Sequence, residues 1–453
     1  MGLGPTAELA FARRDAWRWF MLAIGSIAVA GAFALYLAIA RIPGLEQALA
    51  PDPKFGWRGL IVHVNLALGV WFGAFTAGLF CLLPGARRLR VTQTAQMLAL
   101  LGVLVFSSTL FIREAEPIRS NYIPTLDHWV FLLGLGLFGG SVGLSYLDRR
   151  LLPDGAHSDI PADAQAGLRA AALATLTALA TFAMAWLTQP ANMLPEGYYH
   201  RLFWGGGHVL QFANVLAMVS CWLLLLGKVT RRPVLHGRFG AVLFALLLLP
   251  ALAGPWLMLA ETSDAWFTQM MRWGIWPVTS VLILLCARAL LSARPALAPG
   301  ALRSTAFVGF ATSVAMTIAG FILGAMIRDD STLVPGHYHM SIGAVTAAFM
   351  ATFLVLLEPQ GRTQPDARPR RLAVWQPLLF GGGQAVMALG FAIAGVAGAE
   401  RKAYGSDQQV RSVGEWIGLS VMGGGAVLAS VGGIVFLVLA YRALRTRVDS
   451  AAA

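Results

Sequence analysis

Long apolar runs, separated by short polar or charged stretches, organise this chain from one end to the other. A helix needs about 20 mostly apolar residues to cross the hydrocarbon core of a bilayer. Twelve segments satisfy this requirement, and we predict membrane-spanning helices at 17–40, 58–83, 93–112, 127–147, 166–189, 201–227, 237–259, 270–291, 304–326, 335–357, 374–398 and 413–441. Because the connections are short, we expect residues 1–453 to form one all-α transmembrane domain.

The composition favours a membrane protein over a soluble one. Hydrophobic residues make up 57% of the chain and charged residues only 12%, whereas soluble domains carry about 25% charged residues. The net charge of +12 could indicate nucleic-acid binding, but the basic residues punctuate the apolar runs and form no patch. We therefore expect a lipid bilayer, and no nucleic acid, as the partner of this surface.

The basic residues also predict an orientation. If both termini and the even-numbered connections share one side, that side collects 23 of the 34 Lys and Arg residues and leaves 11 for the other. Cytoplasmic connections carry the excess of positive charge. We predict a multi-pass protein of a bacterial-type inner membrane, with both termini in the cytoplasm.

Histidines in three inward-running spans share one depth. In the second span, His63 lies six residues past Trp57, or about 9 Å below the outer surface. In the sixth span, His208 lies about two turns past His200. Helix packing could bring such histidines together around a bound ligand.

The tenth span carries a pair, His337 and His339, about two turns past residues 328–330. Residues two apart on a helix point about 200° from each other, so these imidazoles cannot bind one metal ion. They can serve two cofactors, one on each side of the helix, and planar cofactors with axial imidazoles are haems. His63 is a candidate to complete one site, and His208 faces the other.

Plainer interpretations remain for some of these residues. His63 alone fits a cofactor ligand and a structural histidine about equally well, because an intramembrane imidazole can also bond a neighbouring helix. The remaining histidines fit ordinary roles at span entrances or in cytoplasmic connections: His128, His200, His157 and His236. The Gly205–Gly207 run fits close approach of another helix or of a flat cofactor.

Four motifs, in this order on these spans, resemble subunit I of the haem–copper oxidases, the superfamily that includes cytochrome c oxidases and nitric oxide reductases. Residues 336–345 (GHYHMSIGAV) resemble its tenth-span motif, and residues 202–208 (LFWGGGH) its sixth-span stretch. Residues 63–66 (HVNL), followed by Leu-Leu-Pro at 82–84, resemble its second span, and residues 398–402 (GAERK) resemble its outer loop after the eleventh span. The resemblance covers nearly the whole chain.

The resemblance implies the roles of individual residues and two haems. His63 and His339 would hold a low-spin haem, and His337 a high-spin haem. His208 would be a copper ligand on the distal side. Arg401 and Lys402 would bind haem propionates.

The chain departs from the family where copper would bind. The family's two adjacent histidines of the seventh span fall at Leu252 and Ala253, and its tyrosine four residues after the sixth-span histidine falls at Phe212. One of three copper ligands survives, which disfavours stable copper binding. Met258 is a soft alternative ligand, although a Met at helical spacing is more often packing.

The function expected from the resemblance is a respiratory haem oxidoreductase. Electrons would pass from the low-spin to the high-spin haem, which binds O2 or NO, and the donor would be cytochrome c, a membrane cytochrome subunit or a quinol. Two alternatives stay open, a non-catalytic gas-binding haem sensor and an electron-transfer or assembly subunit of a partner complex. Protons could enter from outside near Glu196, Glu261 or Asp264.

Overall fold

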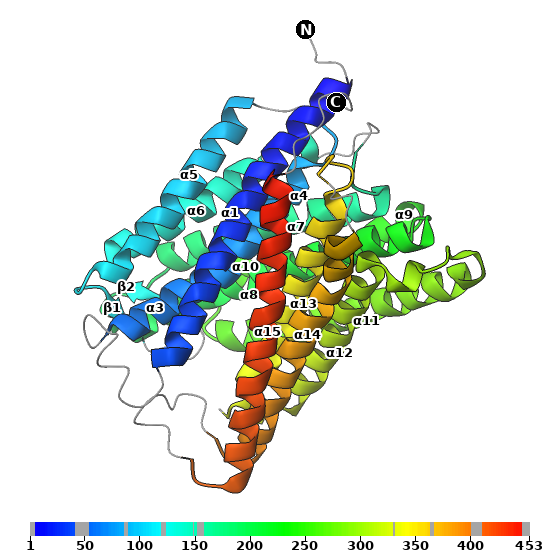
Figure 1. The fold of residues 1–453 in the computed structure, drawn as a ribbon. Coiled ribbons are helices and arrows are strands. Elements are labelled where there is room, and N and C mark those ends of the chain that lie inside the picture. Colours follow the sequence, from blue (N-terminus) through cyan, green and yellow to red (C-terminus); the bar gives the residue numbers. More distant parts are fainter. Residues whose placement is uncertain are drawn as a thin grey trace. The chain divides into compact units, whose positions relative to one another are not determined.

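The computed structural model describes residues 5–40, 54–85, 89–118, 124–147, 149–151, 158–328, 331–362, 367–399 and 410–445 (Figure 1). Twelve stretches of the described chain are helices long and apolar enough to cross a membrane. The predicted all-α fold with twelve spans is therefore confirmed. The chain divides into two compact units, residues 1–220 with 235–282 and residues 221–234 with 283–453. The prediction of one domain stays a prediction, and each unit is described by itself.

The first unit contains the helices of the first five spans and the seventh, together with most of the sixth and the eighth. In chain order its elements are α1 (Pro5–Ala40), α3 (Phe55–Val64), a π-helix (Asn65–Val70), α4 (Trp71–Cys81), α5 (Leu89–Ser108), a 3-10 turn (Thr109–Phe111), β1 (Glu116–Pro117), β2 (Leu126–Asp127), α6 (Trp129–Tyr146), a 3-10 turn (Arg149–Leu151), α7 (Ala162–Leu187), α8 (Pro195–Thr230), α9 (Gly237–Leu252), α10 (Gly254–Leu257) and α11 (Ser263–Ala293). The strands pair antiparallel, with Glu116 opposite Asp127. Both α8 and α11 continue into the second unit.

The second unit is built mainly from α12 (Thr305–Met326), α13 (Leu333–Leu356), α14 (Ala367–Val396) and α15 (Val413–Arg445). Two 3-10 turns, Arg294–Ala296 and Ala301–Arg303, precede α12. Trp222, on the last part of α8, donates its Nε1 hydrogen to Ser313 Oγ of α12 over 2.8 Å. The Ser313 hydroxyl in turn donates to the backbone oxygen of Ala344 on α13 over 2.7 Å. These bonds satisfy side-chain polar groups inside the unit, where lipid offers no partner.

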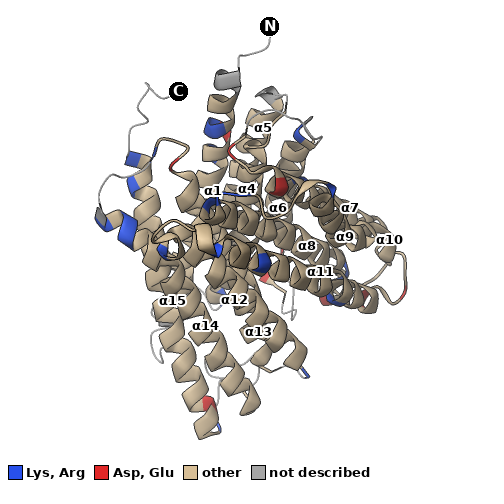
Figure 2. Cartoon of the chain, turned by 90° about the vertical axis from the view of Figure 1, so that its right-hand side faces the viewer, with Lys and Arg blue, Asp and Glu red and all other residues tan. Residues whose placement is uncertain are grey.

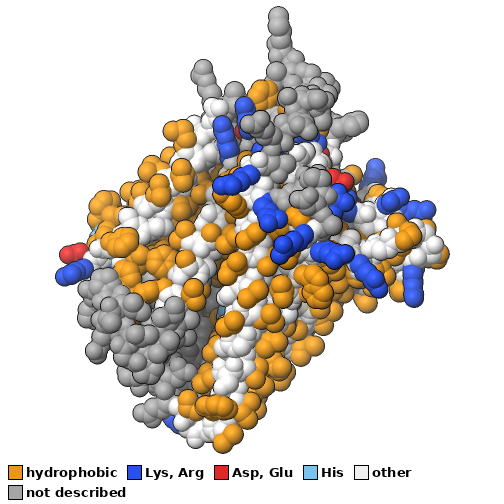
Figure 3. Space-filling view, in the orientation of Figure 1, with side chains coloured by type: hydrophobic (Ala, Val, Ile, Leu, Met, Phe, Trp, Pro, Cys, Tyr) orange, Lys and Arg blue, Asp and Glu red, His pale blue; other side chains and the backbone are white. Residues whose placement is uncertain are grey.

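The helix flanks are apolar and the charges lie at helix ends. Exposed side chains such as Met97, Leu104 and Trp273 are 74%, 60% and 69% accessible, which fits contact with lipid tails. Figure 3 shows hydrophobic side chains along the exposed flanks of the helices. Figure 2 shows the middle parts of the helices almost free of charged residues. This distribution is that of a multi-pass membrane protein.

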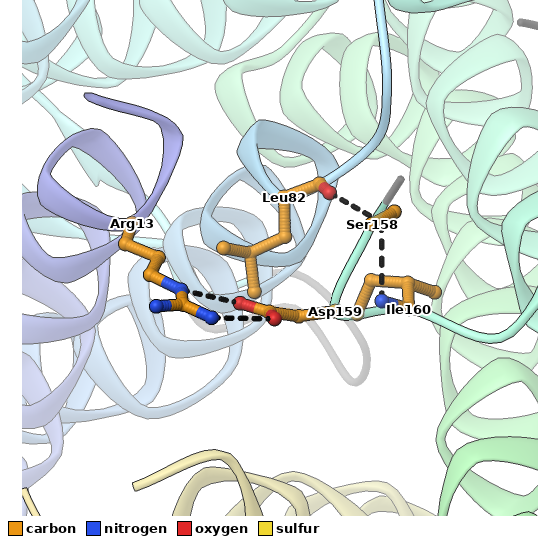
Figure 4. Close-up of polar contacts among 5 residues, drawn as sticks. All are labelled: Arg13, Leu82, Ser158, Asp159 and Ile160. Atoms are coloured by element: carbon orange, nitrogen blue, oxygen red, sulfur yellow. Dashed lines mark hydrogen bonds and ion pairs between the residues drawn. The ribbon is translucent and has the colours of Figure 1, made fainter. Parts of the chain in front are cut away.

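An ion pair fastens the connection before α7 to α1 in the first unit. Arg13 makes two parallel 2.9 Å bonds to the carboxylate of Asp159 (Figure 4). Ser158 donates its hydroxyl to the backbone oxygen of Leu82 over 2.6 Å and accepts from Ile160 N over 3.1 Å. A bidentate guanidinium–carboxylate pair fixes orientation as well as distance. The connection is thereby tied to α1 and to the end of α4.

Glycines seven residues apart let α14 and α15 pack backbone to backbone, and the two helices lie side by side in Figure 1. On α15 these are Gly418, Gly425 and Gly432. A Cβ at Gly425 would lie 2.6 Å from Met387 Cα, and one at Gly432 would lie 2.6 Å from Phe380 Cα. Real Cβ atoms do not approach backbone this closely. Small residues at helix crossings are a common basis of helix association in membranes.

We expect Gly425→Val to separate α14 from α15 and to destabilise the protein by about 1–3 kcal/mol, the usual cost of overpacking. The measurement is the thermal unfolding midpoint in detergent. Gly424→Val is the matched control, because a Cβ at Gly424 meets no atom within 4 Å. Equal midpoints for the two variants would contradict this account of the packing.

Candidate functional site

His63 lies near the end of α3, at a break in the second span. Its Nδ1 lies 2.7 Å from the backbone oxygen of Ala30 on α1. The π-helix begins two residues later, and its first residue, Asn65, donates Nδ2 hydrogens to the backbone oxygens of Ile61 and Pro124 over 2.9 and 2.8 Å. Short π-helical segments frequently occur at functional sites. Here the altered helix geometry directly follows a candidate ligand.

His208 is buried on α8, with 7% of its surface accessible. Its Nδ1 lies 2.8 Å from the backbone oxygen of Trp204, one turn earlier. The indole of Trp204 contacts the imidazole at a tilt of 43°, with ring centroids 4.4 Å apart, and the centroid of the Phe267 ring lies at 6.2 Å. The surroundings of this histidine within the first unit are therefore largely aromatic.

Neighbouring side chains occupy the space beside the glycine run that precedes His208. A Cβ at Gly205 would lie 2.6 Å from Met258 Sδ and 2.7 Å from the ring of Phe267, and one at Gly206 would overlap the ring of Phe182. These contacts support the interpretation that the run permits close helix packing. Met258 lies against α8 as a packing residue and is 2% accessible.

The positions expected to ligate copper carry no ligating atoms. Leu252 is the last residue of α9, and Ala253 connects α9 to α10. Phe212 is completely buried, and its ring lies 2.8 Å from where a Cβ of Gly274 would stand. Among the residues that the structure describes, no group of three or more His, Cys, Asp or Glu side chains could hold a metal ion. The donor set of the first unit does not fit a three-histidine copper centre.

The two histidines of α13 contact different helices of the second unit. His337 Nδ1 lies 2.8 Å from the backbone oxygen of Gly320 on α12. His339 Nδ1 lies 3.1 Å from the side-chain oxygen of Gln384 on α14, and its ring stacks on Phe391 with centroids 5.5 Å apart. The two imidazoles therefore point from α13 toward different helices, His337 toward α12 and His339 toward α14. This arrangement fits two cofactors better than one.

One feature is common to all four span histidines: Nδ1 faces an oxygen acceptor. A carbonyl oxygen only accepts hydrogen bonds, so Nδ1 carries the proton and Nε2 carries the lone pair. A histidine that binds metal through one ring nitrogen almost always donates the N–H of its other ring nitrogen to an oxygen acceptor. In this arrangement Nε2 of His63, His337 and His339 would be the atom that could hold haem iron.

The histidines at the span entrances behave differently. His128 Nδ1 accepts from Val130 N at 3.3 Å, as a helix cap. His200 uses Nε2, which lies 2.8 Å from an Asp264 carboxylate oxygen, and its ring stacks on Trp204. Neither shares the pattern of the four deeper histidines. His200 and Asp264 form a pair at the starts of α8 and α11.

Some expected site residues lie outside the described part of the chain. These are Arg401 and Lys402; His157, for which an ordinary role in a connection was expected, also lies outside it. Gln384 and Asn65 were missed in the sequence, although each is an amide inside an apolar span next to a candidate histidine or a glycine run. An amide in a membrane span needs a partner, and that rule could have identified both.

The fold and these histidines together define a multi-pass helical membrane protein with the donor atoms for axial haem ligation. The chain belongs to the family of cytochrome c and quinol oxidase polypeptide I, whose sequence model matches residues 15–435. The predicted relationship to subunit I of the haem–copper oxidases is thereby confirmed.

Relatives and one solved structure extend this result. The chain is 31% identical to an uncharacterized protein of Aquifex aeolicus over 348 residues, which cover 75% of this chain and 84% of that protein. It is 24% identical to an uncharacterized protein of Rickettsia prowazekii, covering 92% of this chain and 94% of that one. A haem–copper terminal oxidase dimer solved by cryo-electron microscopy contains a chain of the same fold, with a TM-score of 0.72 and 16% identity over 96% of this chain and 83% of that one.

We expect purified protein to contain less than one copper per chain after copper loading, because the resemblance leaves His208 as one expected copper ligand of three. Elemental analysis checks this expectation. Stoichiometric copper, magnetically coupled to a high-spin haem iron, would contradict it.

Proposed function

We propose that this chain is a membrane haem oxidoreductase in which His63 and His339 bind a low-spin haem and His337 binds a high-spin haem. The observation that carries the proposal is the contact of Nδ1 with an oxygen acceptor in each of the three proposed ligands. When bound, haem supplies one-electron transfer and, where one axial position is open, a place for O2 or NO.

The chain's own residues supply orientation and basicity. The backbone oxygen of Ala30 accepts the Nδ1 hydrogen of His63, and that of Gly320 accepts the Nδ1 hydrogen of His337. These two hydrogen bonds fix the plane of each imidazole ring. Such a bond also raises the basicity of the opposite nitrogen, which strengthens it as a ligand. On α13 the side chains of His337 and His339 leave toward α12 and α14 respectively, so one helix serves two cofactors.

A second candidate function is gas binding without full reduction of O2. Phe212 stands where the family's tyrosine would be, and Leu252 and Ala253 stand where two copper ligands would be. Four-electron reduction draws electrons from that metal and that tyrosine in the family, so their replacement favours NO chemistry, partial O2 chemistry or gas sensing. His208 is proposed to face the gas.

Electrons need an external donor, for which we propose cytochrome c or a membrane cytochrome subunit. An electron-transfer or assembly role in a partner complex is the remaining alternative. We propose a bacterial-type inner membrane with both termini cytoplasmic, as the distribution of Lys and Arg predicts.

We expect His63→Ala to abolish the low-spin haem spectrum while CO binding persists. We expect His337→Ala to abolish CO binding while the low-spin spectrum persists, because each variant removes an axial ligand of a different haem. Redox difference spectra with and without CO provide the measurement.

The matched control is His128→Ala, because His128 caps a helix and its Nδ1 accepts a backbone hydrogen bond. Both haem signals should survive in that variant. Persistence of both signals in His63→Ala would show that the ligand assignment is wrong, and absence of haem from the wild-type protein would end the proposal.

We also expect Arg401→Ala with Lys402→Ala to shift the haem midpoint potentials and to lower haem occupancy. The propionate contacts proposed for these residues are charge-assisted hydrogen bonds, each worth about 1.5–3 kcal/mol. Redox titration checks this, and unchanged potentials at full occupancy would rule the contacts out.

A further inference from the structure

Gln384 differs from the other acceptors because it is a side chain. His63, His208 and His337 direct Nδ1 to backbone oxygens, whereas His339 directs Nδ1 to Gln384 Oε1 over 3.1 Å. A backbone oxygen is present whatever the residue type. The acceptor at His339 is a side chain, so a single substitution can remove it or change its strength. Among the four contacts, this one can therefore be tested directly by mutation.

The packing of α14 holds this amide in place. A Cβ at Gly343, one turn after His339, would lie 3.5 Å from Gln384 Cγ and 3.6 Å from its Cβ, so the stem of Gln384 lies against α13. On the other side, a Cβ at Gly383 would lie 2.6 Å from Ala429 Cα of α15. Gln384 is therefore carried by a segment packed against helices on both sides.

A second residue of α14 supports the same histidine. Phe391 stacks on the imidazole of His339, with the ring planes 16° apart. Its backbone oxygen accepts the hydroxyl hydrogen of Thr332 over 2.9 Å, which ties this part of α14 to the start of α13. The ring of His339 is thus oriented by a stacking contact and by a hydrogen bond from one helix.

We propose that Gln384 is a positioning residue that sets the orientation and basicity of His339 and thereby the midpoint potential of the low-spin haem. This inference rests on the proposed function, in which His339 binds that haem. An acceptor at Nδ1 makes Nε2 a stronger electron donor to iron. A stronger axial donor stabilises the oxidised iron, so the potential falls as the acceptor becomes stronger.

The test compares the intact protein with Gln384→Leu and Gln384→Glu by redox titration of the low-spin haem, together with its electron paramagnetic resonance spectrum. We expect the midpoint potential to rise in Gln384→Leu, which has no acceptor, and to fall in Gln384→Glu, which offers a carboxyl oxygen. The resonance positions of the oxidised haem should shift in both, because ring orientation and ligand strength change.

Gln376→Leu is the control on the same helix. Gln376 is buried two turns earlier and bonds Met350 Sδ over 3.1 Å and the backbone oxygen of Gly432 over 3.4 Å. Its replacement disturbs α14 without touching His339, so the midpoint potential and the resonance positions should stay at wild-type values.

An unchanged midpoint potential in Gln384→Leu at full haem occupancy overturns the inference, and so does an equal shift in Gln376→Leu. If Gln384→Leu does not retain haem, Gln384→Glu decides, and an unchanged or raised potential there overturns the inference. A wild-type protein without low-spin haem overturns the proposed function itself, which separates that failure from this one.

Discussion

An imidazole N–H inside a bilayer must find its acceptor in the protein, because hydrocarbon offers none. The helix ladder already uses most backbone oxygens, so the acceptor comes from an oxygen that also bonds its own helix or from a polar side chain. His208 uses the oxygen one turn back on α8, and His63 and His337 use oxygens of neighbouring helices. Each solution places the proton on Nδ1. The requirement to satisfy the ring therefore also prepares Nε2 as a ligand.

Bonds between helices demand a close and fixed approach, which small residues provide. The backbone of α12 comes near enough to α13 for Gly320 to accept from His337, and a Cβ at Gly320 would lie 2.7 Å from Ser341 Oγ. Gly336 permits the same closeness between α13 and α14, since its Cβ would lie 3.1 Å from the backbone oxygen of Ala388. The glycines of α14 and α15 extend this packing outward. In the second unit, the close approach of the helices is therefore also what allows the His337 ring to reach its hydrogen-bond acceptor.

The sequence was sufficient to predict the spans, because apolar runs of bilayer length, repeated twelve times, are typical of membrane-spanning helices. It also singled out the four histidines, because imidazoles are costly in a membrane. It could not predict their partners. The carbonyl of Gly320 lies on a different helix from His337, and the sequence does not show which turn of α12 faces that imidazole. Gln384 was overlooked for the same reason, since its distance from His339 is 45 residues along the chain.

The departures that the resemblance implies, at Phe212, Leu252 and Ala253, all fall in the first unit, which also holds His208. Pro250 lies inside α9, which ends two residues later, and the chain resumes as α10 at Gly254. A Cβ at Gly254 would lie 2.6 Å from a methyl carbon of Val209, so this break packs directly beside His208. Phe212, one turn further along α8, packs on Gly274 and lies near Pro250. The space around the break is therefore occupied by close apolar packing, and introducing histidines at 252 and 253 alone would not recreate a metal centre. A three-histidine centre at this position would need the helix break and its apolar neighbours to be repacked as well as the ligands to be introduced.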